Sequence, residues 1–154
     1  MSLYWHQLET LKAIRDPDID IILNYGVPNS GKSLAAYLNT LQGGNSALGL
    51  YPNQKSVKEQ EKRIDKYLKQ FKLEKNIVIN CLSKYDLEFY REAQNISSLE
   101  LKIESSDILL IDPSIIQDWY NVKCGLNEEN TEIWSILERK FPLFIIDDFY
   151  QFSP

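Results

Sequence analysis

A glycine-rich segment near the N-terminus carries the residues best suited to chemistry. It reads Gly26-Val27-Pro28-Asn29-Ser30-Gly31-Lys32-Ser33 and satisfies the pattern G-x-x-x-x-G-K-[S/T] in full. In this pattern backbone N–H groups surround a β-phosphate, the lysine reaches the β- and γ-phosphates, and the serine hydroxyl ligates Mg²⁺. A helix that follows presents its first N–H groups to the same phosphates. The segment therefore predicts a phosphate-binding loop (P-loop) for a nucleoside triphosphate with Mg²⁺. The predicted contacts are Gly26, Pro28, Asn29, Ser30, Gly31, Lys32 (also catalytic) and Ser33 (also a metal ligand).

A P-loop enzyme also needs a carboxylate at the end of a neighbouring strand. Asp112 follows the apolar run 107–111, and Asp147-Asp148 follows the run 143–146. We favour the paired acids, since one can hold Mg²⁺ through water while the other orients the attacking water. Asp147 is then the metal acid and Asp148 the water-positioning acid, both catalytic. Asp112 precedes a proline and fits a helix N-cap, and a surface turn is the alternative for the paired acids.

Apolar runs alternate with helical patterns along the whole chain. Strands are expected at 19–23, 47–51, 77–79, 108–111 and 143–146. Helices are expected at 32–41, 55–71, 84–93, from 113 onward and at 131–139, whereas 94–105 and 122–130 receive no assignment. Short, uniformly apolar strands that alternate with helices are typical of a parallel sheet covered on both faces. We therefore predict a single doubly wound α/β domain over residues 1–154, with five strands and the P-loop after the first.

Composition narrows the classes of protein that remain. The chain has 154 residues, a net charge of −5, 44% hydrophobic and 25% charged residues, which suits one globular domain. The negative charge argues against coating of nucleic acid through bulk charge. Cys81, Cys124 and a single histidine offer no structural zinc site. No apolar run or N-terminal pattern indicates a membrane span or a signal peptide, so a cytoplasmic protein without membrane association is expected.

With these motifs in place, the sequence resembles the first RecA-like domain of a superfamily 2 helicase. The similarity is greatest to the helicase of type I CRISPR systems, in particular the type I-D form. Residues 5–10 (Trp-His-Gln-Leu-Glu-Thr) stand where this family has its adenine-reading glutamine motif, and residues 31–38 match the type I-D wording. Residues 47–53 with Gln60, and residues 107–115, resemble two motifs that contact DNA, and residues 147–150 stand at the DEAD/DEFH box.

The resemblance implies an ATP-dependent DNA helicase or translocase of a CRISPR antiviral system. Its implied cofactors are ATP and Mg²⁺, with Gln7 at the adenine. Its implied partners are single-stranded DNA, a second RecA-like domain or chain, and a CRISPR effector complex. The implied contacts to nucleic acid are Tyr51, Pro52, Asn53, Gln60, Asp112 and Pro113.

Several positions depart from the family. Asp148 stands where the family has glutamate, and Tyr150 replaces the histidine of the box. The sequence ends shortly after that box, so we expect the second RecA-like domain and its arginine finger to lie outside this chain. An arginine finger is worth about 10³–10⁵ in rate. Little or no unwinding, and ATP hydrolysis well below that of a complete helicase, are therefore expected from the chain alone.

Two other functions fit part of the pattern. A viral superfamily 3 replication helicase would suit both motifs, but those compact motors place the P-loop and the acids closer together in sequence. A nucleotide-binding interaction module that does not hydrolyse ATP would suit the shortened acid at 148, whereas the intact Lys32 and Ser33 argue against loss of binding. The lysines of 55–69 are expected to form a solvated face balanced by Glu59, Glu61 and Asp65, with a DNA track as the alternative. Core or interface packing is expected for Trp119, Tyr120 and Trp134, with base stacking as the alternative.

Overall fold

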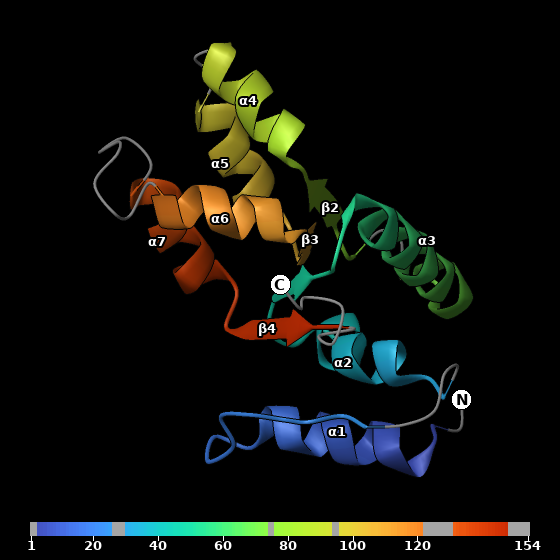
Figure 1. Cartoon of the computed structure of the whole chain (residues 1–154). Coiled ribbons are helices and arrows are strands. Elements are labelled where there is room, and N and C mark those ends of the chain that lie inside the picture. Colours follow the sequence, from blue (N-terminus) through green and yellow to red (C-terminus); the bar gives the residue numbers. More distant parts are fainter. Residues whose placement is uncertain (1–2, 26–29, 74–75, 94–95, 122–130, 148–154) are drawn as a thin grey trace. The chain divides into compact units, whose positions relative to one another are not determined.

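The fold is known from a computed structural model, which describes residues 3–25, 30–73, 76–93, 96–121 and 131–147 (Figure 1). Internal contacts divide the chain into two compact units, a first unit of residues 1–45 and a second unit of residues 46–154. The helices and strands are, in chain order, α1 (Trp5–Arg15), α2 (Lys32–Leu41), β1 (Ala47–Leu50), α3 (Gln54–Phe71), β2 (Ile79–Leu82), α4 (Lys84–Glu92), α5 (Ile96–Glu104), β3 (Ile108–Ile111), α6 (Pro113–Asn121), α7 (Thr131–Lys140) and β4 (Leu143–Ile146).

The first unit is a pair of packed helices. Helix α2 spans the residues predicted for it, whereas α1 was not predicted as a helix. The last residue of α1 joins the two helices: Arg15 Nε donates to Asn39 Oδ1 at 2.9 Å, and Arg15 Nη2 donates to Gln42 Oε1 at 2.9 Å. These two bonds fix the C-terminal turn of α1 against the C-terminal end of α2.

The strand predicted at 19–23 is wrong. The segment is not part of any ladder, and its apolar side chains are not buried: Ile21 is 80% exposed and Leu23 87% exposed. The apolar pattern predicts burial, but a strand also requires a neighbour that receives its backbone hydrogen bonds. Within the described residues the sheet therefore has four strands instead of five, and the P-loop is not preceded by a strand.

The second unit is built on a parallel sheet with strand order β2-β3-β1-β4. The strands predicted near 47, 108 and 143 are confirmed. The third strand, predicted at 77–79, lies at Ile79–Leu82 instead. Among the described strands β2 lies at an edge of the sheet, and three of its four residues are only partly buried, so Asn80 and Cys81 can stand in it and interrupt the apolar pattern. The hydrophobic pattern indicates which residues are buried, and it therefore does not give the bounds of this partly exposed strand.

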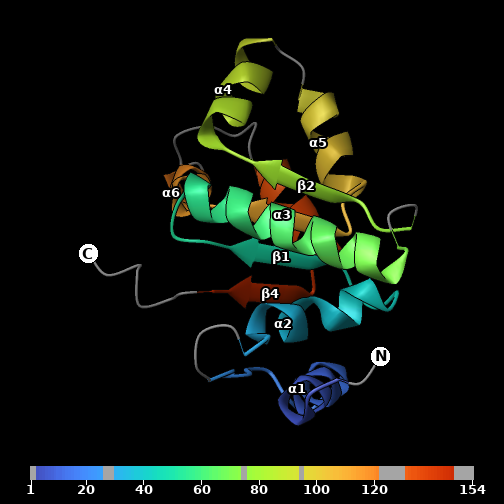
Figure 2. The same ribbon diagram turned by 90° about the vertical axis from the view of Figure 1, so that its right-hand side faces the viewer.

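Helices cover both faces of this sheet, as predicted (Figures 1 and 2). Helix α3 lies on one face, and α6 and α7 lie on the other. Strand β3 is wholly buried, and the core beside α5, α6 and α7 includes Leu109, Ile111, Ile103, Ile115 and Leu137. Successive side chains of a strand point to opposite faces, so Ile108 and Leu110 of β3 face α3.

Strand β4 differs from the uniformly buried strand that its sequence predicts. Its burial alternates, with Phe144 49% exposed and Ile146 50% exposed. Among the described residues β4 pairs only with β1 and therefore forms an edge of the sheet. The apolar residues of β4 favour a strand. Because β4 lies at the edge of the sheet, its side chains are only partly covered by neighbouring elements.

Candidate functional site

The second half of the P-loop pattern lies at the N-terminus of α2. Gly31 precedes the helix with φ 84° and ψ 19°, a left-handed conformation that glycine adopts without strain. Lys32 and Ser33 are the first two helical residues. The N-cap residue, Gly31, has no side chain with which to cap α2, and the first turn contains no acidic residue. A helix N-terminus with a lysine and no acid in its first turn is suited to an anion such as a phosphate. Residues 26–29 of the pattern lie outside the described residues.

Two buried polar atoms of the first unit have unused hydrogen-bonding capacity. The Ser30 hydroxyl and His6 Nε2 are buried, and neither has a hydrogen-bond partner in the described part of the chain. A buried polar group without a partner costs about 1–3 kcal/mol. A ligand oxygen beside Ser30 would remove that cost, so the residues present fit a bound phosphate group.

Gln7 contacts Gly31, in the described end of the P-loop pattern, across 24 positions of sequence. Its side chain is only 3% exposed. Gln7 Nε2 donates to the Gly31 carbonyl at 3.3 Å, and Gln7 Oε1 accepts from the Tyr4 N–H at 2.9 Å. Gln7, which the family resemblance places at the adenine, therefore contacts Gly31 of the P-loop pattern. Both residues belong to the first unit.

The predicted acids belong to the second unit. Asp147 follows β4, is partly buried, and its N–H donates to the Leu50 carbonyl of β1 at 3.2 Å. Asp148 and Tyr150 lie outside the described residues.

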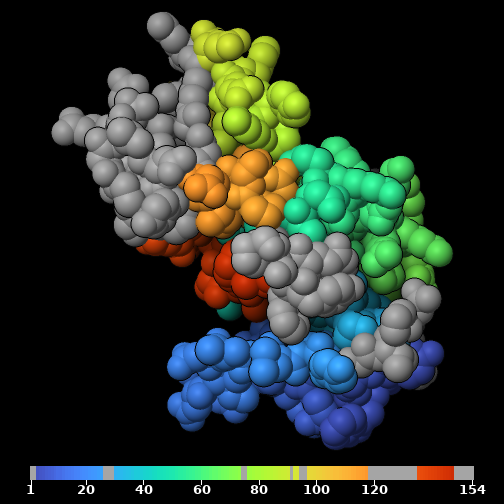
Figure 3. Space-filling view, viewed as in Figure 1, coloured from blue at the N-terminus to red at the C-terminus, as the bar shows by residue number. Residues whose placement is uncertain are grey.

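Asp112 has the structural role predicted for it. It is 5% exposed, and its Oδ1 accepts from the Ser114 N–H at 2.8 Å and from the Ser114 hydroxyl, which caps α6. Its Oδ2 accepts from Gln54 Nε2 at the start of α3. Figure 3 shows α6 (orange) beside the N-terminal part of α3 (blue-green) on the surface. The carboxylate is therefore engaged in holding two helices at the end of β3.

The two segments predicted to contact nucleic acid lie side by side where β1 and β3 end. Leu50 pairs with Ile111, and the N–H of the next residue, Tyr51, donates to the Ile111 carbonyl at 3.0 Å. Pro52 and Pro113 therefore follow neighbouring strands at the carboxyl edge of the sheet, where ligands of parallel sheets bind.

Individual side chains of these segments suit nucleic acid less well. Tyr51 is 3% exposed and Gln60 is 2% exposed. The Asn53 side chain accepts from the Ser56 N–H at 3.0 Å and caps α3. In this structure the side chains of Tyr51 and Gln60 are not available to a nucleic acid, so contacts at this edge would come from backbone groups and from the more exposed residues.

Two lysines of α3 form ion pairs with acidic residues on the exposed surface of the helix, as the prediction of a solvated, charge-balanced face requires. Lys58 contacts Glu61 at 3.1 Å and Lys69 contacts Asp65 at 2.6 Å. The hydrogen bond to Glu61 raises the pKa of Lys58. Pairs of this kind at i, i+3 and i, i+4 support the helix itself.

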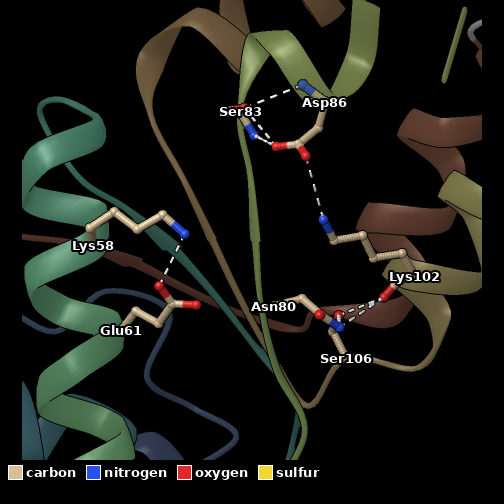
Figure 4. A network of polar contacts seen from close by, with 7 residues as sticks. All are labelled: Lys58, Glu61, Asn80, Ser83, Asp86, Lys102 and Ser106. Atoms are coloured by element: carbon tan, nitrogen blue, oxygen red, sulfur yellow. Dashed lines mark hydrogen bonds and ion pairs between the residues drawn. The ribbon is translucent and has the colours of Figure 1, made fainter. Parts of the chain in front are cut away.

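A polar cluster beside β2 was not anticipated from the sequence (Figure 4). It lines a cavity of about 220 Å³ and includes Lys58, Asn80, Cys81, Asp86 and Lys102. Asp86 Oδ2 accepts from the N–H and hydroxyl of residue 83, and Asp86 lies 3.8 Å from Lys102 of α5. The S-x-x-D spacing at 83–86 is a helix-start signal, but nothing local indicates Lys102.

The ionisation of this cluster follows from its contacts. Burial alone would raise the pKa of Asp86, but the hydrogen bonds from Ser83 and the charges of Lys102 and Lys58 lower it below its usual value. Burial, and then the negative charge of Glu61, raise the pKa of the Cys81 thiol to about 12. The thiolate is the reactive form of cysteine, so Cys81 is unsuited to nucleophilic chemistry at neutral pH.

The side chains of Trp119, Tyr120 and Trp134, for which core or interface packing is expected, lie outside the described residues. None of the helices in the described part of the chain is both long and apolar enough to cross a membrane. Comparison of the sequence with protein-family models and with curated proteins finds no match. The functional argument therefore rests on the residues of this chain.

Proposed function

We propose that this chain binds Mg²⁺-ATP through residues 26–33 and serves as the ATP-binding part of a DNA helicase or translocase. The observation that carries the proposal is the end of the motif. Gly31 has a left-handed conformation and leads directly into α2, which begins with Lys32 and Ser33 and has no acidic residue in its first turn. This is the local structure that a phosphate-binding loop requires.

Four of the predicted residues have defined roles in this proposal. Lys32 neutralises the β- and γ-phosphates, and the Ser33 hydroxyl ligates Mg²⁺, which supplies charge neutralisation when bound. Asp147 holds the hydration shell of the metal and Asp148 positions the attacking water. The parallel sheet with helices on both faces is compatible with a RecA-like domain.

The helicase part of the proposal rests on the sequence resemblance and on one structural feature. The segments after β1 and β3, which resemble the DNA-contacting motifs, are neighbours at the carboxyl edge of the sheet. We extend the proposal to single-stranded DNA as the track and to a second RecA-like domain or chain as the partner. The similarity of residues 31–38 to the type I-D helicase sequence supports a role for the chain in a CRISPR antiviral assembly.

Nucleotide binding is tested by calorimetry with Mg²⁺-ATP and Mg²⁺-ADP. Lys32→Ala should weaken binding roughly 10- to 150-fold, because a hydrogen bond to a charged group is worth about 1.5–3 kcal/mol. Lys12→Ala is the matched control, since Lys12 is an exposed lysine of the same unit that pairs with Glu9 on the surface. Equal affinity of the Lys32→Ala variant and the wild type would refute the proposal.

Hydrolysis separates the motor from an interaction module. ATP turnover is measured with and without single-stranded DNA, on this chain and on an assembly that contains a second RecA-like domain. Turnover stimulated by DNA in the assembly supports the motor, and Asp148→Glu should raise it because glutamate restores the reach of the family's acid. Tight ATP binding without turnover in any assembly would favour the interaction module instead.

A further inference from the structure

The hydrogen bonds of Gln7 suggest a role different from reading a base. Both ends of its amide are engaged by backbone groups: Oε1 accepts from the Tyr4 N–H, and Nε2 donates to the Gly31 carbonyl. The side chain is 97% buried, since only 3% of its surface is exposed. A base edge that used the same two atoms would compete with both of these bonds.

The contact with Gly31 is also sterically tight. A Cβ atom built on Gly31 would lie 2.6 Å from Gln7 Nε2, closer than non-bonded atoms approach. The glutamine amide therefore occupies the space that the missing side chain of Gly31 leaves open. Gly31 is the residue whose left-handed conformation directs the chain into α2, with Lys32 next in sequence. A group that holds the Gly31 carbonyl thus sets the direction of the N–H groups that follow it.

We propose that Gln7 is a positioning residue that holds Gly31, and with it the N-terminus of α2, in place and so controls affinity for the phosphate chain, whatever base is attached. The inference rests on the proposed function, because it presupposes that residues 26–33 bind phosphates. It differs from the role implied by the family resemblance, in which the same glutamine selects adenine. The two roles predict different ligand dependence.

The test compares Mg²⁺-ATP, Mg²⁺-GTP and Mg²⁺-tripolyphosphate, the last of which has no base. Gln7→Ala should weaken all three by the same factor, about fivefold to tenfold, which corresponds to one neutral hydrogen bond. Gln7→Glu keeps an oxygen for the Tyr4 N–H but replaces the donor to the Gly31 carbonyl with a carboxylate oxygen. It should weaken all three at least as much while the helix start is preserved. Asn45→Ala, which removes an exposed carboxamide of the same unit, should leave all three unchanged.

The outcomes are distinguishable. A loss confined to ATP, with tripolyphosphate binding unchanged in both Gln7 variants, means that Gln7 reads the base and overturns the inference. Wild-type affinity in Gln7→Glu overturns it as well, because the bond to Gly31 would then be dispensable. If the wild-type chain binds none of the three ligands, the proposed function itself fails. Thermal unfolding of each variant, followed by circular dichroism, shows that the compared proteins are folded.

Discussion

The substitution Asp112→Ala tests whether this acid is structural or catalytic. Asp112 is buried at the end of β3, where it caps α6 through Ser114 and accepts a hydrogen bond from Gln54 of α3. Alanine removes all of these bonds and adds no new contact. We therefore expect a stability defect and no specific loss of ATP turnover in an assembly that hydrolyses ATP.

The magnitude follows from the contacts that are lost. Removal of an N-cap side chain costs about 0.5–2 kcal/mol. A partly buried donor on Gln54 that loses its acceptor costs about 1–3 kcal/mol. Since the terms are not strictly additive, we expect the free energy of unfolding to fall by about 2–4 kcal/mol. For a chain of this size that lowers the melting temperature by roughly 5–15 °C.

The assay is urea unfolding followed by circular dichroism, with Asn53→Ala as the comparison. Asn53 caps α3 through two exposed hydrogen bonds from Ser56, so its replacement should lower the free energy of unfolding by only about 1 kcal/mol. If Asp112→Ala is as stable as the wild type, the anchoring role is refuted. If it folds normally but abolishes ATP turnover, Asp112 is the catalytic acid and the assignment of the pair Asp147-Asp148 is wrong.

Three further predictions follow from the contacts described above. The lowered pKa of Asp86 means that its ionised form stabilises the fold above about pH 3.9, the usual aspartate pKa, and that this contribution disappears as the pH falls through the lower folded pKa. Unfolding measured from pH 2 to 6 should therefore show Asp86→Asn losing less stability on acidification than the wild type, and parallel curves would contradict this. With its pKa near 12, Cys81 should react with iodoacetamide about 10³-fold more slowly at pH 8 than a free thiol in a Cys124→Ser background, and a rate equal to that of a free peptide thiol would refute it. Gly31→Ala should lower the free energy of unfolding by about 1–3 kcal/mol, because alanine is strained at φ 84° and its Cβ would meet Gln7. The same substitution should weaken tripolyphosphate binding. A variant with the melting temperature and binding of the wild type would disprove the tight contact.

Several features that depend on near neighbours in sequence were predicted well, although the helices α1 and α5 were not predicted. Helix α2 and strands β3 and β4 have the predicted residues because their apolar spacing is local. Asp112 followed by Pro113 marks the start of α6 by the chemistry of the cap alone. The P-loop pattern was recognised from eight consecutive residues, and the described end of it has the expected glycine turn and helix.

Two errors, at residues 19–23 and at β2, concern pairing between distant segments. The apolar run at 19–23 has the composition of a strand, but no described strand receives its hydrogen bonds, and Ile21 and Leu23 remain exposed. The reverse holds for β2, whose Asn80 interrupts the apolar pattern although the residue lies in a ladder with β3. A strand exists only where a neighbour pairs with it, and hydrophobicity along one segment does not contain that information.

The same distinction applies to the candidate sites. The sequence by itself determined which residues form the proposed phosphate-binding motif, because the motif is contiguous and its predicted chemistry depends on residue type and spacing. Only the tertiary structure decided that Gln7 holds the Gly31 carbonyl and that Asp86 lies beside Lys102. These contacts join helices that are separated in sequence, and they form because the packing of those helices brings the side chains within hydrogen-bonding distance.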